Sequence, residues 1–290
     1  MLARQRQAVI LDEVRRTGAV RVSDLVHKLG VSDMTVRRDL DVLANRGLLE
    51  KVYGGATSII GRSTEEPGFE AKSVRQRPEK EAISKHAAGL VRPGTAIGLS
   101  AGTTTWTLAR FLVDIPNLTV VTNSIKVADV LSARARPDRT VIITGGVRTP
   151  SDALVGPVAV QTLRALHLDL VFLGVHGIAP HTGFTTPNLN EGETDRALLD
   201  SANRRVVLAD HSKWNVVGIS TIADFEEADV LIVDDGFPDE ATEFLAENVG
   251  ELVTVTPRNR GDGRSDEPSE MAKDSEKYTE ENAENNEGTA

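Results

Sequence analysis

Five short segments combine small residues, hydroxyls and polar groups in a way that suits a small phosphorylated ligand. They are Ser100-Ala101-Gly102-Thr103-Thr104-Thr105, Thr122-Asn123-Ser124, Gly145-Gly146, Gly174 to Gly177, and Asp210-His211-Ser212-Lys213. The first leads directly into a predicted helix, whose free N–H groups can bind an anion. Lys213 suits a phosphate, and the other polar groups suit sugar hydroxyls. Ordinary β-to-α turns also favour Gly, Ser, Thr and Asp, so only the whole set favours binding.

A second group of polar residues lies near the N-terminus and suits double-stranded DNA. The side chains of Thr35 and Arg38 can hydrogen-bond to base edges, and those of Ser32 and Arg37 suit phosphates. A helix starting here would add backbone donors and a partial positive charge. The candidate DNA-contacting residues are Ser32, Asp33, Thr35, Arg37, Arg38, Lys51 and Tyr53. The alternative is a helical hairpin whose arginines are merely solvated.

Three short helices are predicted to position this second group. The expected helices cover residues 4–16, 23–29 and 32–46, and the expected strands cover 19–22 and 48–53. Ser23 and Ser32 are the expected N-caps, and Gly30 should supply the left-handed turn that ends the middle helix. Two helices around a Gly-containing turn indicate a helix-turn-helix, and the last strand, followed by Gly54-Gly55, suits a β-ribbon wing.

The five ligand-type segments each follow a short apolar run, and helical segments lie between these runs. The expected strands are 95–99, 118–122, 140–144, 170–174, 205–209 and 230–233, and the expected helices are 104–113, 125–135, 158–166 and 193–202. This order predicts a doubly wound, mostly parallel α/β domain. Ligands of such sheets bind at the carboxyl ends of the strands, where the five segments fall.

Charge is unevenly distributed along the 290 residues. The net charge is −10, with +3 in residues 1–56, −8 in 57–256 and −5 in 257–290. A basic module on an acidic body is one pattern of DNA-binding regulators, although a solvated basic face explains it equally well. The last segment has too few large apolar residues to offset its ordering entropy. We expect a DNA-binding domain (1–56), a linker (57–75), an α/β domain (76–256) and a disordered acidic tail (257–290).

Composition and missing motifs exclude several classes of function. The chain has no cysteine, so disulfides, thiolate zinc sites and a cysteine nucleophile are excluded. It has neither a Walker motif nor a Gly-x-Gly-x-x-Gly run after a strand. We expect no cofactor and no metal, because His176, His181 and His211 are more simply turn residues. No apolar run nears the roughly 18 residues that cross a membrane, and the first residues do not form a signal peptide, so we expect a cytoplasmic protein.

The N-terminal motifs resemble the DeoR family of bacterial transcriptional repressors. The matching strings are Val22-Ser23-Asp24-Leu25, Leu29-Gly30-Val31-Ser32, Thr35-Val36-Arg37-Arg38-Asp39-Leu40 and Tyr53-Gly54-Gly55-Ala56, with Arg6, Ile10 and Val14 at the family's first-helix spacing. The strings "GTTT" at 102–105, "VTNS" at 121–124, "GG" at 145–146 and "ADHSKW" at 209–214 resemble the family's C-terminal domain. The resemblance covers about residues 1–255.

The resemblance implies a winged helix-turn-helix followed by a sugar-phosphate-sensing domain related to ribose-5-phosphate isomerase. By the same resemblance, phosphate contacts fall on Gly102, Thr103, Thr104 and Thr105, with further effector contacts at Asn123, Asp210 and Lys213. Ser100 stands where an acidic residue is common in the family, and His176 lies in a glycine-rich turn that is often followed by Asp in the family. Glu193 and Arg196 stand where a Glu and a Lys are usual. These departures bear on which sugar is bound.

The expected function is a repressor of a sugar-metabolism operon, acting as a homodimer or tetramer and released from operator DNA by a phosphorylated sugar. One alternative is an isomerase-like enzyme with an appended DNA-binding arm, in which Glu191, Glu193 or Asp210 would move the proton. In a third interpretation, residues 1–56 bind a protein and not DNA.

Overall fold

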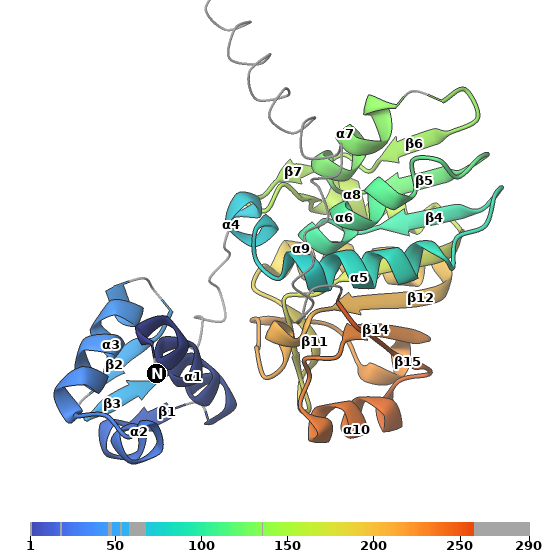
Figure 1. Ribbon diagram of the computed structural model, residues 1–290. Coiled ribbons are helices and arrows are strands. Elements are labelled where there is room, and N and C mark those ends of the chain that lie inside the picture. Colours follow the sequence, from blue (N-terminus) through green and yellow to red (C-terminus); the bar gives the residue numbers. More distant parts are fainter. Residues whose placement is uncertain are drawn as a thin grey trace, which may run out of the picture. The chain divides into compact units, whose positions relative to one another are not determined.

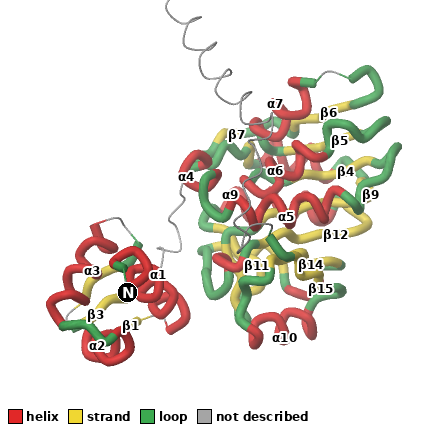
Figure 2. Tube along the Cα trace, in the orientation of Figure 1, coloured by secondary structure: helices red, strands yellow, loops and turns green. Residues whose placement is uncertain are grey.

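The computed structural model describes residues 2–17, 19–45, 48–52, 54–57, 68–134 and 136–257 (Figures 1 and 2). The expected acidic tail, apart from Pro257, lies outside these residues, as does Tyr53. The described chain comprises an N-terminal domain up to residue 57 and a larger α/β domain from residue 68 onward. No described helix is both long and apolar enough to cross a membrane.

The N-terminal domain has three helices around a small sheet, as the sequence predicts. Its elements are α1 (Ala3–Thr17), β1 (Ala19–Arg21), α2 (Val22–Leu29), α3 (Asp33–Asn45), β2 (Glu50–Val52) and β3 (Gly55–Thr57). The strands form an antiparallel sheet in the order β1-β3-β2, with β2 and β3 as the wing. Buried Ile10, Leu25 and Leu40 belong to the common core of the three helices.

Of the two predicted N-caps, one is confirmed and one is wrong. The Ser32 hydroxyl accepts a hydrogen bond from the Thr35 N–H (3.3 Å), as expected. Ser23 does not cap α2, which already begins at Val22 with Arg21 as the N-cap residue. The Val22 N–H donates to the Gly54 carbonyl (2.9 Å) at the wing turn, so tertiary structure provides the partner for this donor. Gly30 has φ 64° and ends α2 in the left-handed conformation, as expected.

The α/β domain is built on one seven-stranded parallel sheet in the order β15-β14-β12-β9-β4-β5-β6. Its strands are β4 (Ala96–Leu99), β5 (Thr119–Thr122), β6 (Thr140–Ile143), β9 (Leu168–Gly174), β12 (Ala202–Ala209), β14 (Val230–Asp234) and β15 (Leu252–Val255). The helices are α4 (Phe69–Ser73), α5 (Arg77–Ala88), α6 (Thr103–Phe111), α7 (Ile125–Ala133), α8 (Pro157–Arg164), α9 (Leu189–Asp200) and α10 (Asp239–Asn248). The order confirms the predicted doubly wound fold.

Two smaller sheets and two 3-10 turns lie between these elements. An antiparallel sheet is formed by β10 (Gly177–Ala179), β11 (Gly183–Thr186) and β13 (Ser220–Ala223), and a hairpin by β7 (Val147–Arg148) and β8 (Leu154–Val155). The 3-10 turns are η1 (His211–Lys213) and η2 (Phe225–Glu227). These short strands are not predicted from the sequence, and neither are α4, α5, α10 and β15.

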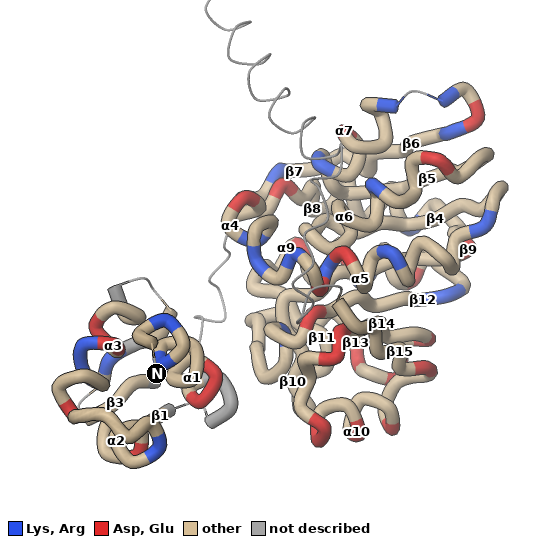
Figure 3. Tube along the Cα trace, viewed as in Figure 1, with Lys and Arg blue, Asp and Glu red and all other residues tan. Residues whose placement is uncertain are grey.

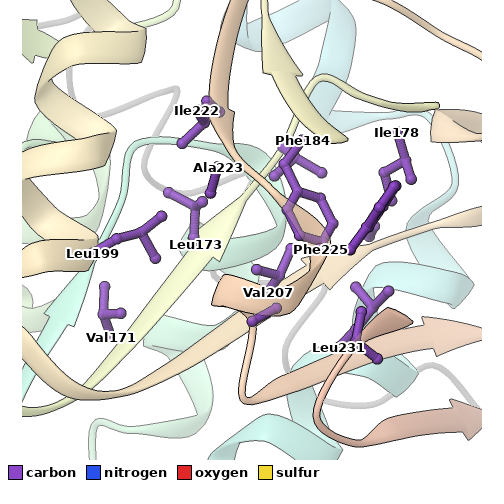
Figure 4. Packing of buried hydrophobic residues seen from close by; sticks show 14 of the residues in the cluster. Val171, Leu173, Ile178, Phe184, Leu199, Val207, Ile222, Ala223, Phe225 and Leu231 are labelled. Carbon is purple, nitrogen blue, oxygen red and sulfur yellow. The ribbon is translucent and has the colours of Figure 1, made fainter. Parts of the chain in front are cut away.

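Apolar residues of the central strands alternate between two cores, one on each face of the sheet. In β9, Leu170 and Phe172 join α5, α6 and α7 on one face, whereas Val171 and Leu173 join α8, α9 and α10 on the other. Figure 4 shows Val171 and Leu173 among the residues of the second core, with Phe184 and Phe225 packed nearby. Because both faces are covered, binding groups are left to the strand ends.

Helix α4 lies inside the stretch 57–75 that the sequence analysis assigns to a linker. The Phe69 ring is buried and meets the Trp106 ring edge-on, with centroids 5.7 Å apart. Trp106, at the start of α6, therefore packs against the segment that enters the α/β domain. Residues 69–73 are accordingly folded onto this domain.

Candidate functional site

The N-terminus of α3 presents polar side chains at the surface of the N-terminal domain. The hydroxyls of Ser32 and Thr35 lie 2.9 Å apart and hydrogen-bond to each other. Met34, between them, is 80% exposed. The first-turn N–H groups of a helix have no partner within the helix, so this end has free donors for a phosphate.

The charged residues predicted to contact DNA are exposed, and three of them, Asp33, Arg37 and Lys51, take part in surface ion pairs. Arg37 pairs with Asp33 one turn earlier on α3, and Lys51 of β2 pairs with Asp41. Arg38 is exposed and has no ion pair among the described residues. Figure 3 shows the basic positions on α3. Exposed pairs contribute about 0–1 kcal/mol, so DNA phosphates can replace Asp33 and Asp41 as partners at little cost.

Asp39 holds the face of α3 that points away from these residues. Its carboxylate accepts hydrogen bonds from Arg6 Nε and from Gln7 Nε2 (3.0 Å), both on α1, and its side chain is 5% exposed. The sequence analysis names Arg6 and Asp39 only as parts of the family pattern. Their contact positions α3 against α1, so both have a structural role in the candidate DNA-binding surface.

In the α/β domain, the predicted effector residues follow three strands at the centre of the sheet, β5, β4 and β12. The spatial order is β5, β4, β9 and β12, so β9 lies between β4 and β12. The chain runs from β4 outward through β5 and β6, but from β9 outward through β12, β14 and β15, so the topological switch point lies between β4 and β9. Open parallel sheets bind ligands at this crevice. The Gly174 N–H at the end of β9 donates to Ser100 Oγ (3.0 Å), which joins the two central strand ends.

The threonines after β4 form the first turn of α6, and all three are buried. The Thr105 hydroxyl donates to the carbonyl of Ser100 (2.7 Å), and so stabilises the turn. For the hydroxyls of Thr103 and Thr104, the described residues provide no hydrogen-bond partner. Gly102 is the N-cap residue of α6, and the helix N-terminus behind it leaves backbone donors for an anion.

Asn123 and Asp210 flank the switch point from the adjacent strands, and each is only 1% exposed. Asn123 Oδ1 accepts a hydrogen bond from the Ala101 N–H (2.8 Å), whereas its Nδ2 is buried and has no hydrogen-bond partner among the described residues. Asp210 Oδ1 accepts from the Ser212 N–H (3.1 Å), whereas Oδ2 is likewise buried without one. Leaving a buried polar atom unsatisfied costs about 1–3 kcal/mol, so both atoms mark a place for a ligand or water.

Lys80 of α5 joins this region, although the sequence analysis does not select it. Its ammonium donates to the carbonyls of Lys72 and Arg75, both at 2.6 Å. Burial lowers the pKa of Lys80 to about 8, with Asp210 opposing this shift and Lys213, Lys72 and Arg75 adding to it. Lys80 and Lys213 therefore lie in one electrostatic environment around Asp210.

His211 forms a hydrogen bond with the buried carboxylate of Asp234, a contact not predicted from the sequence. Its Nδ1 lies 2.7 Å from Asp234 Oδ2, and its backbone N–H donates to Asp234 Oδ1 (2.7 Å). The hydrogen bond to Asp234 raises the pKa of His211 against the effect of burial. Burial acts to raise the pKa of Asp234, but the hydrogen bonds from His211 outweigh burial and bring the pKa of this carboxyl below its usual value.

Of the three histidines His176, His181 and His211, only His211 joins a cluster of metal-ligand type among the described residues. Glu79, His211 and Asp234 form it, with one ligand atom of each within 4.8 Å of the others. Within this cluster, His211 Nδ1 and Asp234 Oδ2 are hydrogen-bonded to each other. The backbone N–H of His176 donates to the carbonyl of Thr185 on β11 (3.1 Å), next to the pairing of β10 with β11.

The carboxylates considered for proton transfer have different surroundings. Glu191 Oε1 accepts hydrogen bonds from Thr149 (2.9 Å) and Ser151, and Glu193 is exposed. Asp195, one turn after Glu191, is buried, and burial together with the nearby Glu191 raises the pKa of this carboxyl well above its usual value. Trp214 packs against Phe237 and Phe244, with centroids 6.3 and 6.1 Å away, and is part of the core.

Both halves of the chain match known families. Residues 6–61 match a family model described as the DeoR-like helix-turn-helix domain, and residues 75–235 match one described as the DeoR C terminal sensor domain. Among solved structures, ribose 5-phosphate isomerase A of Methanocaldococcus jannaschii has 19% identity and a TM-score of 0.35, covering 47% of this chain and 53% of that one.

Relatives match over most of their length. The uncharacterized HTH-type transcriptional regulator YgbI of Escherichia coli (strain K12) is 36% identical over 84% of this chain and 95% of its own. The HTH-type transcriptional regulator GlpR of Haloferax volcanii is 34% identical, over 81% and 91%. The transcriptional repressor AccR of Agrobacterium fabrum is 31% identical, over 80% and 89%. With a helix-turn-helix domain and a sensor domain of this kind, the chain belongs to the DeoR family of transcriptional regulators.

Proposed function

We propose that the protein represses a sugar-metabolism operon and is released from its operator by a phosphorylated sugar. The observation that carries the effector assignment is the pair of buried atoms without partners, Asn123 Nδ2 and Asp210 Oδ2. The first is a donor, and the second is an acceptor. They flank the N-terminus of α6 across four strands, which is about 14 Å at the backbone. A sugar phosphate supplies an anion, hydroxyl donors and oxygen acceptors over such a span.

Each part of the site has a proposed role. The N-terminus of α6 binds the phosphate through its backbone N–H groups and the hydroxyls of Thr103 and Thr104. Lys213 adds a positive charge to the phosphate. Asp210 accepts a hydrogen bond from a sugar hydroxyl, and Asn123 donates one to a sugar oxygen. Gly102 and Thr105 shape the turn that presents these groups.

On the DNA side, α3 enters the major groove. Thr35 and Arg38 contact bases, and Ser32, Arg37 and the wing residue Lys51 contact phosphates. Helix-turn-helix proteins commonly read two half-sites about one turn apart, so the working form is a homo-oligomer, a dimer or tetramer. AccR is named a transcriptional repressor, which supports repression as the direction of control. The protein would act in the cytoplasm, where operator DNA is accessible.

The test is a gel shift on the DNA upstream of the protein's own gene, followed by genomic selection if no shift appears. It is run at one stated salt concentration, because phosphate contacts make affinity salt-dependent. Ribose 5-phosphate, fructose 6-phosphate and glucose 6-phosphate are added in turn. We expect one of them to relieve the shift, and the Lys213→Ala variant to bind operator without being relieved. Failure of every compound contradicts the effector assignment.

A turnover assay with the same compounds addresses the enzyme alternative. Isomerisation needs a carboxylate free to move a proton between adjacent carbons, and the Glu191 carboxylate is engaged by hydroxyls. We expect no turnover. Measurable isomerisation by the wild type, lost in Glu191→Gln, would replace the pure regulator with an enzyme that carries a DNA-binding arm.

A further inference from the structure

The segment that enters the sensor domain is fastened to the proposed effector site. This segment, residues 68–76, comprises α4 and the turn before α5, and is here called the strap. It follows the wing along the chain, separated from it by residues 58–67. Lys80 Nζ donates to the strap carbonyls of Lys72 and Arg75, and Gln76 Nε2 lies 3.3 Å from His211 Nε2.

His211 lies inside the effector loop, between Asp210 and Lys213, and cannot move independently of it. Asp234 holds both the ring Nδ1 and the backbone N–H of His211. A Cβ atom at Gly236 would lie 2.6 Å from His211 Nδ1, so the chain packs closely against the ring. A shift of the loop must therefore be accompanied by a shift of the imidazole and of its contact with Gln76.

Gln76 has the backbone conformation of a residue held in place by its neighbours. Its φ is 49°, in the left-handed region that side chains other than glycine adopt only at a free-energy cost. Two contacts keep it there: its carbonyl accepts the Lys80 N–H (3.0 Å), and its amide meets His211. Without the contact to His211, the right-handed backbone conformation is favoured at Gln76. This change alters the direction of the strap relative to α5.

We infer that Gln76 is a positioning residue through which the effector loop controls the strap, and with it the segment that leads to the DNA-binding domain. The inference rests on the proposed function, because Asp210 and Lys213 are the proposed effector contacts. A phosphorylated ligand that draws these side chains toward itself moves η1, and His211 with it. The Gln76 contact then changes, and the strap reorients. Such coupling requires that the ligand bind the two arrangements with different affinity.

The first test needs no ligand. Hydrogen exchange of the strap amides is measured by mass spectrometry on the full-length wild type, Gln76→Ala and His211→Asn. Because one hydrogen bond holds the strap to the loop, we expect strap exchange to be about fivefold faster in both variants. Gln161→Ala, the same change at an exposed position of α8, is the matched control. Exchange in β4 and β9 verifies that each variant is folded. Unchanged strap exchange in Gln76→Ala overturns the inference.

The second test measures coupling. Operator affinity of the wild type and Gln76→Ala is compared with and without ribose 5-phosphate, fructose 6-phosphate or glucose 6-phosphate. We expect Gln76→Ala to bind operator DNA as the wild type does, and to bind the releasing compound. When that compound is added, the operator affinity of Gln76→Ala should fall by a factor about fivefold smaller than the factor for the wild type. Full release from Gln76→Ala overturns the inference and leaves the proposed function standing. If none of the three compounds releases the wild type from operator DNA, but strap exchange is faster in Gln76→Ala, the proposed function fails. The link between the effector loop and the strap then stands.

Discussion

The two candidate sites of this chain present their polar groups in opposite ways. At the DNA-binding surface, the side chains of Arg37 and Asp33 are 52% and 58% exposed and are paired with each other. At the effector site, Asn123 and Asp210 are 1% exposed, and each keeps one atom without a hydrogen-bond partner among the described residues. The difference matches the size of the expected ligand, because DNA lies across a surface whereas a sugar phosphate must be enclosed.

This difference in exposure determines how much free energy is involved when each site binds its ligand. Surface pairs contribute about 0–1 kcal/mol, so the DNA-binding domain gives up little when phosphates replace its acidic partners. Buried unsatisfied atoms cost about 1–3 kcal/mol each, so the sensor domain recovers that free energy when a ligand satisfies them. Single changes should therefore act on operator affinity through charge, and on effector affinity through individual hydrogen bonds.

The largest effect is expected at Asp39, whose side chain is buried, unlike the exposed charged residues of the DNA-binding surface. Asp39→Ala removes the buried carboxylate that accepts hydrogen bonds from Arg6 and Gln7, and we expect the N-terminal domain to lose about 2–4 kcal/mol of unfolding free energy. The measurement is thermal and urea unfolding of the full chain, followed by operator binding. Asp41→Ala, which removes the exposed partner of Lys51, is the control and should cost under about 1 kcal/mol. Equal losses in the two variants would contradict a structural role for Asp39.

The next effect separates two adjacent arginines of α3. Arg38 is proposed to read a base, and Arg38→Ala should weaken operator binding by about 1–3 kcal/mol and relax specificity at one position. Arg37→Ala should weaken binding to all sequences alike and reduce the salt dependence by about one phosphate contact. Titrations at several salt concentrations, on operator and on scrambled DNA, distinguish these outcomes. Unchanged DNA binding in both variants would mean that α3 is not the recognition helix.

A smaller effect is expected at Asp210. Asp210→Asn preserves the shape of the side chain but can place a donor where the buried Oδ2 acceptor lies. We expect affinity for the releasing sugar phosphate to fall about tenfold, or 1.4 kcal/mol, with operator binding unchanged in the absence of sugar phosphate. Calorimetric titration of the sugar phosphate measures it. Unaltered affinity would remove Asp210 from the effector site.

The sequence predicts the central sheet well, because its signals are local and repeated. Each central strand is a short apolar run, and each is followed by a turn whose residue types are those of a ligand site. Since parallel strands align their carboxyl ends, predicting the strands also predicts that Asn123 and Asp210 lie at the same edge of the sheet. The strand order that places them on either side of one crevice comes from the structure. The fold class and the DeoR assignment are confirmed. The assignments of individual contact residues remain predictions.

What the sequence does not reveal depends on contacts between distant segments. Ser23 and Ser32 have the same local signal, yet only Ser32 caps a helix, because the wing carbonyl of Gly54 satisfies the donor at the start of α2. Lys80 resembles any helical lysine, and its burial depends on the strap folding back over α5. The partner of His211 is Asp234, 23 residues away and on the next strand of the sheet.

The pH dependence of stability tests the buried cation of the sensor domain, Lys80. Its pKa in the folded protein is about 8, below the ordinary 10.5, so between these values the unfolded chain holds a proton that the folded chain has lost. Unfolding then takes up protons, and this residue's contribution to stability rises with pH across that window. In Lys80→Met the contribution is absent, so the stability of the wild type minus that of the variant should increase from about pH 8 to pH 10.5. Urea unfolding at half-unit pH steps measures it, with Lys85→Met, an exposed position of the same helix, as the matched control. A difference that stays flat across the window would mean that Lys80 is solvated, and that the contrast between an exposed and a buried site does not extend to this residue.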